Sequence, residues 1–176
     1  ILPSAEKSSI DIYNVNKSFS GAQNVTVPKS VYSAAKTHTF QIVNWSPDGS
    51  YISMWHEYNK MRELILIDIA NPNESFIVAS AAINKPFTFM YNPKNNSQIY
   101  TLSNSGTLLL RSMTAKSKPI QVAKNVSSFE LYKNGILYVQ KGKKSSTIYY
   151  LGSPISKRQL LKKIFSDGIV EISASS

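Results

Sequence analysis

The stretch WSPDGSYI at residues 45–52 decides the fold, because it places a tight turn between two apolar runs. Asp48 and Gly49 tolerate the positive φ that the tight turn of a β-hairpin requires. The run at 39–45 before the turn and the run at 50–55 after it are rich in β-branched and aromatic residues, which is typical of strands. This stretch therefore predicts a β-hairpin.

The same arrangement recurs further along the chain. Tyr91 opens a turn 46 residues after Trp45, and Tyr132 opens another 41 residues later. A period of about 40–45 residues with four short strands in each unit is typical of the blades of a β-propeller. Each such sheet has two apolar faces that it cannot bury alone, so neighbouring units are expected to stack.

Alternating apolar runs predict most of the remaining strands. They lie at 8–15, 62–69, 75–80, 86–91, 97–102, 106–112, 118–123, 127–132, 135–140, 146–151, 158–163 and 168–174. Helical patterning is confined to 29–37 and 156–165, and the second of these also fits a strand. The sequence therefore predicts an all-β, β-propeller-like chain with about four blade-sized units of four-stranded antiparallel sheet, and a β-sandwich is the alternative.

The expected units form a single propeller or propeller fragment over 1–176. They cover 8–28 in part, 38–80, 84–124, 126–163, and 166–175 in part. The chain starts with Ile1 rather than methionine, which favours a piece of a larger propeller whose exposed blade edges pair in a homodimer. Alternatively, the two end pieces combine into one blade and close a four-bladed ring.

The unit at 38–80 resembles the TolB-type, WD-like β-propeller repeat. That repeat reads W-S-P-D-G-x-x-I, followed by a leucine-rich strand with an Asp, and the matching residues are 45–52 and LILIDI at 64–69. The unit at 84–124 departs from it, with Tyr91 in place of Trp, and the unit at 126–163 keeps only aromatic-x-Asn-Gly.

This resemblance implies a propeller fold with protein–protein contact as the default function. Such contact would use the turns at one propeller face, which here contain Asp48, Asn95 and Asn134. A propeller hosts many unrelated activities, so the resemblance does not select a substrate.

Composition excludes several kinds of chemistry. The absence of cysteine excludes disulfides, thiolate metal sites and a cysteine nucleophile. His38 and His56 are the only histidines, which excludes a multi-histidine metal site. No run of about 18 apolar residues predicts a membrane-spanning helix. We expect neither a metal nor another cofactor.

Catalytic candidates are few. His56 and Glu57 are adjacent on a strand and would point to opposite faces, so we expect a histidine at the solvent-exposed rim beside a surface glutamate. His38 is also expected at the rim. Ser46 lacks the Gly-x-Ser-x-Gly elbow and is expected to form a local turn hydrogen bond. The sequence therefore predicts no enzyme; a propeller with an enzymatic or ligand-binding site at its central channel, or an accessory domain of a larger enzyme, is the alternative.

The positive charge is concentrated in one half of the chain. Residues 1–93 carry seven basic and seven acidic side chains, whereas residues 94–176 carry thirteen basic and three acidic ones, which accounts for the whole net charge of +10. The candidate basic patch contains Lys141, Lys143, Lys144, Lys157, Arg158, Lys162 and Lys163. It predicts docking of a protein or an anionic polymer, or else protection of edge strands against aggregation. Nucleic acid is disfavoured because arginine is scarce and no recognition helix is visible.

Together these patterns predict a non-catalytic interaction module. The expected parent is a bacterial surface-exposed or secreted protein, so the expected location is extracytoplasmic or at the cell surface.

Overall fold

A computed structural model describes residues 8–13, 21–85, 87–92, 95–114, 117–152, 158–164 and 172. In this part of the chain every regular element is a strand, apart from two single 3-10 turns, η1 (Lys29–Val31) and η2 (Pro72–Glu74). None of the described residues forms a helix long and apolar enough to cross a membrane. The chain divides into two compact units, 1–84 and 85–176, called unit 1 and unit 2 below.

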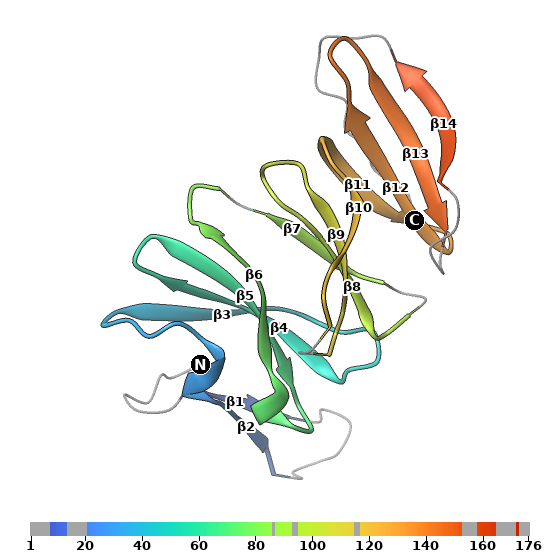
Figure 1. The fold of residues 1–176 in the computed structure, drawn as a ribbon. Helices are drawn as coiled ribbons and strands as arrows, with labels where there is room; N and C mark the ends of the chain where they lie inside the picture. The colour runs from blue at the N-terminus through green and yellow to red at the C-terminus, as the bar shows by residue number, and fades with distance from the viewer. Residues whose placement is uncertain are drawn as a thin grey trace. The chain divides into compact units, whose positions relative to one another are not determined.

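Unit 1 contains one four-stranded antiparallel sheet and one two-stranded ribbon. The sheet runs β3 (His38–Trp45), β4 (Tyr51–Tyr58), β5 (Met61–Asp68) and β6 (Phe76–Ala82), each strand paired with the next in the chain (Figure 1). The ribbon pairs β1 (Ser8–Ile12) with β2 (Gln23–Val27). Val25 and Val27 of the ribbon share a buried core with Ile52 of the sheet, so the two parts are packed together.

The stretch at 45–52 folds as the predicted hairpin turn. The Gly49 amide donates to the Ser46 carbonyl over 2.9 Å, and Gly49 has a φ of +72°, which a side chain would disfavour. The Ser46 hydroxyl donates to Asp48 over 2.7 Å and accepts from the Tyr51 amide over 2.9 Å. The local role expected for Ser46 is therefore confirmed.

The second hairpin of unit 1 is tighter than the apolar pattern suggests. Strands β4 and β5 extend to Tyr58 and from Met61, so that only Asn59 and Lys60 remain in the turn, both with positive φ. That conformation at both central residues matches a two-residue hairpin turn of the primed type.

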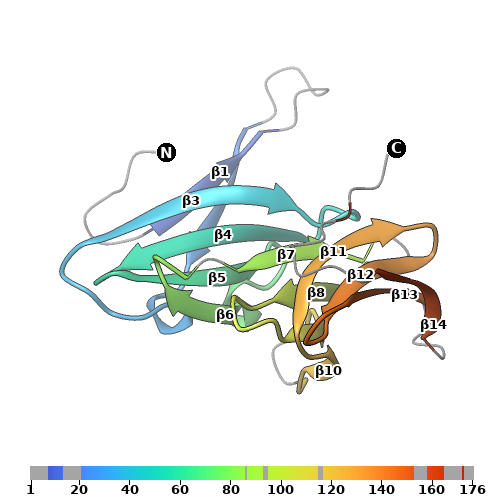
Figure 2. The ribbon, with the colours of Figure 1, turned by 90° about the horizontal axis from the view of Figure 1, so that it is seen from above.

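Unit 2 contains two four-stranded antiparallel sheets. The first runs β7 (Thr88–Tyr91), β8 (Gln98–Leu102), β9 (Leu108–Ser112) and β10 (Ile120–Ala123). The second runs β11 (Val126–Tyr132), β12 (Gly135–Lys141), β13 (Ser146–Gly152) and β14 (Gln159–Ile164), side by side in chain order (Figure 2). One core lies between the two sheets, where Tyr100 and Leu110 of the first meet Phe129, Ile136 and Tyr138 of the second.

These sheets confirm the predicted fold class: the chain is all-β and built from blade-like, four-stranded antiparallel meanders. Over the described ranges, three blade-sized sheets have four strands, and the piece at 8–28 supplies a two-stranded ribbon. The segment at 156–165 contains strand β14 rather than a helix, and 29–37 contributes one 3-10 turn. The strand expected at 168–174, within the end piece 166–175, lies outside the described residues apart from Ile172.

Candidate functional site

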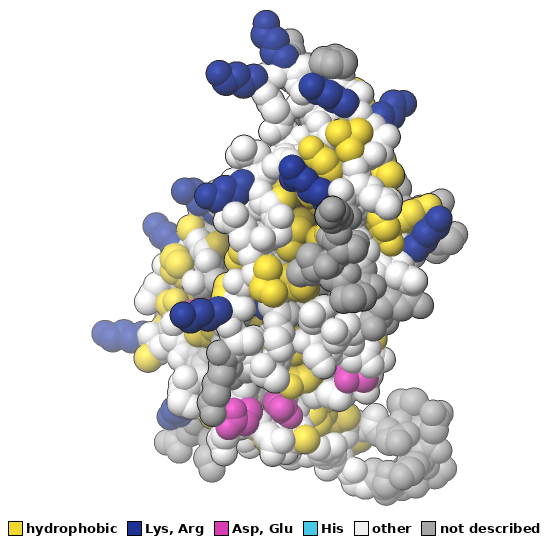
Figure 3. Space-filling view, turned by 45° about the vertical axis from the view of Figure 1, so that its right-hand side comes forward, with side chains coloured by type: hydrophobic (Ala, Val, Ile, Leu, Met, Phe, Trp, Pro, Cys, Tyr) yellow, Lys and Arg dark blue, Asp and Glu magenta, His cyan; other side chains and the backbone are white. Residues whose placement is uncertain are grey.

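Lysines gather at one end of the last sheet. Lys141 is the last residue of β12, and Lys143 and Lys144 lie in the turn between β12 and β13; all three are exposed. Strand β14 pairs with β13 so that Lys163 lies opposite Thr147 and Lys162 opposite Ile148, directly beside this turn. We call Lys141, Lys143, Lys144, Lys162 and Lys163 the basic end. Figure 3 shows Lys and Arg side chains in dark blue over this turn at the top of the view, with no described Asp or Glu beside them.

The structure brings together five of the seven residues of the predicted patch. Lys157 lies outside the described residues. Arg158 precedes Gln159, which pairs with Tyr150 towards the other end of β13, and its guanidinium lies 4.6 Å from the centre of the Tyr149 ring. Arg158 therefore stands apart from the basic end.

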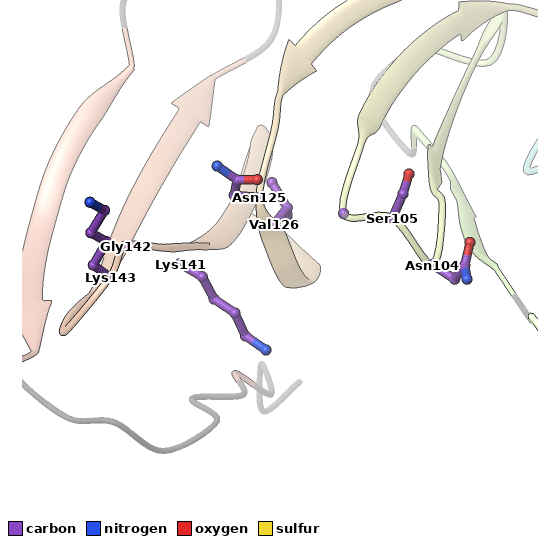
Figure 4. Close-up of a pocket in the computed structure, with 8 residues that line it drawn as sticks. Asn104, Ser105, Asn125, Val126, Lys141, Gly142 and Lys143 are labelled. Carbon is purple, nitrogen blue, oxygen red and sulfur yellow. The ribbon is translucent and has the colours of Figure 1, made fainter.

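A pocket of about 530 Å³ opens beside the basic end, within unit 2 (Figure 4). It is formed by the β8–β9 turn, the β10–β11 connection and the β12–β13 turn. The lining residues are Asn104, Ser105, Gly106, Asn125, Val126, Lys141, Gly142 and Lys143. In Figure 4 Asn104 and Ser105 lie on one side and the lysines on the other, with Asn125 and Val126 between them.

Backbone hydrogen bonds join the three turns. The Val126 amide donates to the Gly106 carbonyl over 2.9 Å, and the Lys141 amide donates to the Asn125 carbonyl over 2.7 Å. Gly106 has a φ of +79°, and a Cβ there would lie 3.0 Å from the Val126 carbonyl oxygen. A side chain at this position would crowd the Val126 backbone and strain the left-handed conformation, which glycine adopts without cost.

Sequence reasoning missed this pocket because its residues come from three separate turns. The available signals were the Asn-Ser-Gly turn at 104–106 and a lone asparagine between two strands at 125. Asn125 does adopt the left-handed conformation that asparagine tolerates, with a φ of +58°.

The predicted loop face consists of residues that mainly hold their own turns. Asp48 accepts from the Ser46 hydroxyl and the Ser50 amide, and the Ser46 hydrogen bond holds the pKa of Asp48 below its ordinary value. Asn95 accepts from the Ser97 amide over 3.0 Å. Asn134 is exposed in the β11–β12 turn, at the opposite end of its sheet from the basic end. A binding role for these three residues stays a prediction.

The expectation for His56 is wrong. Its side chain is fully buried, and its Nδ1 lies 2.9 Å from Oε2 of Glu63, its partner across β4 and β5. Glu57 instead pairs with Arg62, whose guanidinium also lies over the Trp55 ring. His38 is exposed, as expected of a rim residue.

Glu63 is the centre of a buried polar cluster in unit 1. Its carboxylate accepts from the Ser33 hydroxyl over 2.6 Å, from the Ser33 amide over 3.2 Å and from the Tyr58 hydroxyl over 2.9 Å. Burial raises the pKa of Glu63, but the hydrogen bonds from Ser33, His56 and Tyr58 outweigh it and hold that pKa below its ordinary value. Burial lowers the pKa of His56, against the opposing effect of Glu63.

The cluster holds the connection between η1 and β3, which contains Ser33, against strand β5, which contains Glu63. It does not activate a nucleophile. The Ser33 hydroxyl and the His56 ring both bind the Glu63 carboxylate, so serine and histidine do not form the nucleophile–base pair that covalent catalysis needs. Within the described ranges, no three His, Asp or Glu side chains lie close enough together to hold a metal ion.

No protein-family model matches the chain, and no curated protein matches it. Among solved structures, it is similar to a protein from Lactobacillus plantarum, with 15% identity and a TM-score of 0.40, over 69% of this chain and 40% of that one. It is also similar to a chain of a yeast heterotrimeric nucleoporin complex, with 14% identity and a TM-score of 0.47, over 82% of this chain and 38% of that one. The chain thus spans about two fifths of the length of these solved chains.

Proposed function

We propose that this chain is a non-catalytic interaction module that docks a polyanionic partner through the basic end of unit 2. The observation that carries the proposal is the gathering of five exposed lysines on two adjacent segments of one sheet. Glu130 is the one carboxylate among the described residues of unit 2, and it pairs with Leu137 towards the other end of that sheet.

The physical consequence is a local excess of positive charge at this end of the sheet, among the residues that the structure describes. Such a surface attracts anionic macromolecules over a distance comparable to the Debye length and speeds their association. The cations are all lysines, which act as hydrated point charges rather than planar forks. Point charges suit a flexible polymer of spaced anions better than the fixed geometry of a nucleic-acid duplex.

The proposal extends to the parent protein and its location. The TolB-type, WD-like resemblance of residues 38–80 supports an interaction module, and a cysteine-free chain is compatible with a bacterial surface-exposed or secreted protein. Fractionation of cells that produce the full gene product tests the location. Recovery with the extracytoplasmic or surface fraction is expected, and recovery with the cytoplasm alone contradicts it.

Charge reversal tests the docking surface directly. Lys144→Glu combined with Lys162→Glu should weaken binding to poly-L-glutamate about tenfold or more at low salt. The slope of log affinity against log salt concentration should flatten by about one unit for each ammonium lost. Both quantities can be measured by a fluorescence titration of labelled polymer at several salt concentrations.

A matched control separates docking from general charge effects. Lys118 is exposed and lies before β10, at the end of its sheet away from the pocket, so Lys118→Glu should leave affinity and slope nearly unchanged. Edge protection requires a charged side chain on β14 but not a positive one. If the lysines only protect this edge, the double variant should therefore stay as soluble as the parent chain. Unchanged polymer binding in the double variant would show that the lysines do not dock a polyanion.

A further inference from the structure

We infer that the pocket beside the basic end binds an anionic group carried on a polyol, namely a sugar acid or a sugar phosphate. The inference rests on the proposed function, because the pocket shares Lys141 and Lys143 with the basic end. It goes further by naming the chemical class of the group that is recognised.

The polar side chains that line the pocket are of two chemical kinds, and Val126 adds one apolar side chain. Lys141 and Lys143 carry ammonium groups, which only donate and therefore favour an anion. Asn104, Asn125 and Ser105 carry groups that both donate and accept, which matches the hydroxyl groups of a polyol. A ligand that satisfies both kinds has a charged group beside several hydroxyls.

The lining also disfavours other anionic ligands. None of the described residues that line the pocket is aromatic, so it offers no surface on which a nucleic-acid base could stack. None of them is arginine, so a phosphate or carboxylate there would be held by the ammonium groups of the lysines rather than by two parallel hydrogen bonds from a planar fork, whatever molecule carries it. Selectivity among anionic ligands must then come from Asn104, Ser105 and Asn125, whose side chains can bind the hydroxyl groups of a polyol.

The pocket is held open by its own backbone. The Gly106 amide donates to the Ser103 carbonyl over 2.9 Å, and the Ser103 and Ser105 hydroxyls lie 2.8 Å apart. On the other side, the Gly142 amide donates to the Ser145 carbonyl over 2.7 Å. Because the turns are already fixed, binding a small ligand costs little ordering of the chain. The pocket, of about 530 Å³, is wide and open to solvent, so a ligand there would keep part of its surface hydrated.

The experiment is calorimetric titration of the 176-residue chain with matched small probes. Glucuronate is compared with acetate, and glucose 6-phosphate with inorganic phosphate; glucose is the neutral probe. We expect each sugar anion to bind at least about tenfold more tightly than its bare anion, and glucose to bind weakly. The two pairs distinguish a carboxylate from a phosphate as the preferred anion. Equal affinity for sugar anions and bare anions overturns the inference.

A pair of isosteric variants locates the site. Asn104→Asp places a carboxylate in the pocket and should weaken sugar-anion binding about tenfold or more. Asn73→Asp makes the same change at an exposed asparagine of η2 in unit 1, which does not line the pocket, and should leave affinity within about twofold. A combined Asn104→Ala and Ser105→Ala variant adds no charge and should lose the preference for sugar anions over bare anions. Equal effects of the two aspartate variants contradict the assignment.

Polymers separate failure of this inference from failure of the proposed function. Alginate and poly-L-glutamate are both polycarboxylates, but only alginate carries sugar hydroxyls. We expect alginate to bind more tightly than poly-L-glutamate. The combined Asn104→Ala and Ser105→Ala variant should lose this preference, while its binding of poly-L-glutamate keeps the same salt slope. This result supports both the sugar assignment and the proposed function. Equal or tighter binding of poly-L-glutamate overturns the sugar assignment and indicates an acidic protein, whereas binding of neither polymer overturns the proposed function itself.

Discussion

Glu63 is 2% exposed, yet it is charged and accepts four hydrogen bonds. A buried carboxylate is tolerated only when donors replace the water it has lost. Since a carboxylate can only accept, the proton of the His56 ring lies on Nδ1, and Nε2 has no hydrogen-bond partner among the described residues. The rings of Tyr32, Phe40 and Tyr58 surround this imidazole and favour its neutral form through burial.

This cluster predicts acid sensitivity of unit 1. Both pKa values are lower in the folded chain than the ordinary values of 6.5 for His56 and 4.5 for Glu63. The unfolded chain therefore binds more protons as the pH falls, and the free energy of unfolding decreases. The loss should begin as the pH falls below about 6.5, from His56, and deepen below about 4.5, from Glu63. Urea unfolding followed by tryptophan fluorescence measures it, because both tryptophans lie in unit 1.

Two glutamine variants identify the group that causes the decrease in the free energy of unfolding between pH 7 and 5.5. His56→Gln can still donate to Glu63 but does not titrate, so the decrease between pH 7 and 5.5 should disappear while the decrease below 4.5 remains. His38→Gln removes the neighbouring exposed imidazole, whose ring centre lies 5.4 Å from that of His56. Both decreases should remain, the first of them smaller, because the charge of His38 contributes to the lowered pKa of His56. An unchanged decrease between pH 7 and 5.5 in the His56 variant assigns it to another group.

At the scale of single residues, the sequence predicts local contacts and misses distant ones. Ser46 was predictable because its partners lie within five residues, in one turn. His56 was placed wrongly at the rim, because its burial depends on the register that sets Glu63 opposite it. Ser33 lies 30 residues from Glu63, and no local pattern indicates that contact.

At the scale of elements, the hairpin of β12 and β13 depends on a close approach of two strands. Gly135 pairs with Gly152, and a Cβ at Gly135 would overlap the Leu151 carbonyl oxygen and lie 2.8 Å from the Gly152 Cα. Gly135→Ala should therefore destabilise the chain by about 1–3 kcal/mol through overpacking. Thermal unfolding followed by circular dichroism measures the change.

Gly21→Ala is the matched control for this hairpin. A Cβ at Gly21 would meet nothing within 4 Å, so the same substitution should leave stability unchanged or raise it by a few tenths of a kcal/mol. Equal effects of the two variants would mean that the β12–β13 backbone moves apart freely.

Element positions were largely predictable because apolar alternation and turn residues are local signals. The run at 158–163 fitted both a helix and a strand, and pairing with β13 is what makes it β14. The hairpin of β4 and β5 is longer than its apolar runs, since pairing continues through His56, Glu57 and Tyr58 of β4 and begins at Met61 of β5. The pocket was not predictable, because it requires three turns to meet.

At the scale of the whole molecule, two surfaces compete for the role of docking site. The TolB-type resemblance implies the turns at 46–50, 91–96 and 133–135, whereas the charge distribution favours the turns at 104–106 and 141–145. Within unit 2, the β7–β8 and β11–β12 connections of the first set lie at the opposite ends of their sheets from the turns at 104–106 and 141–145. Asp48 adds a negative charge to the first set, and the second set lies beside the described lysines of the basic end.

Hydrogen exchange of the whole chain with and without a polyanion decides between these surfaces. If electrostatic attraction selects the site, alginate should slow amide exchange at 103–107, 124–126 and 141–145, because a bound polymer restrains those turns. Amides at 46–50 and 133–135 should exchange at unchanged rates and so serve as internal controls. Protection at 46–50 and 133–135 alone would place docking on the face implied by the resemblance, and the lysines would then act as edge protection.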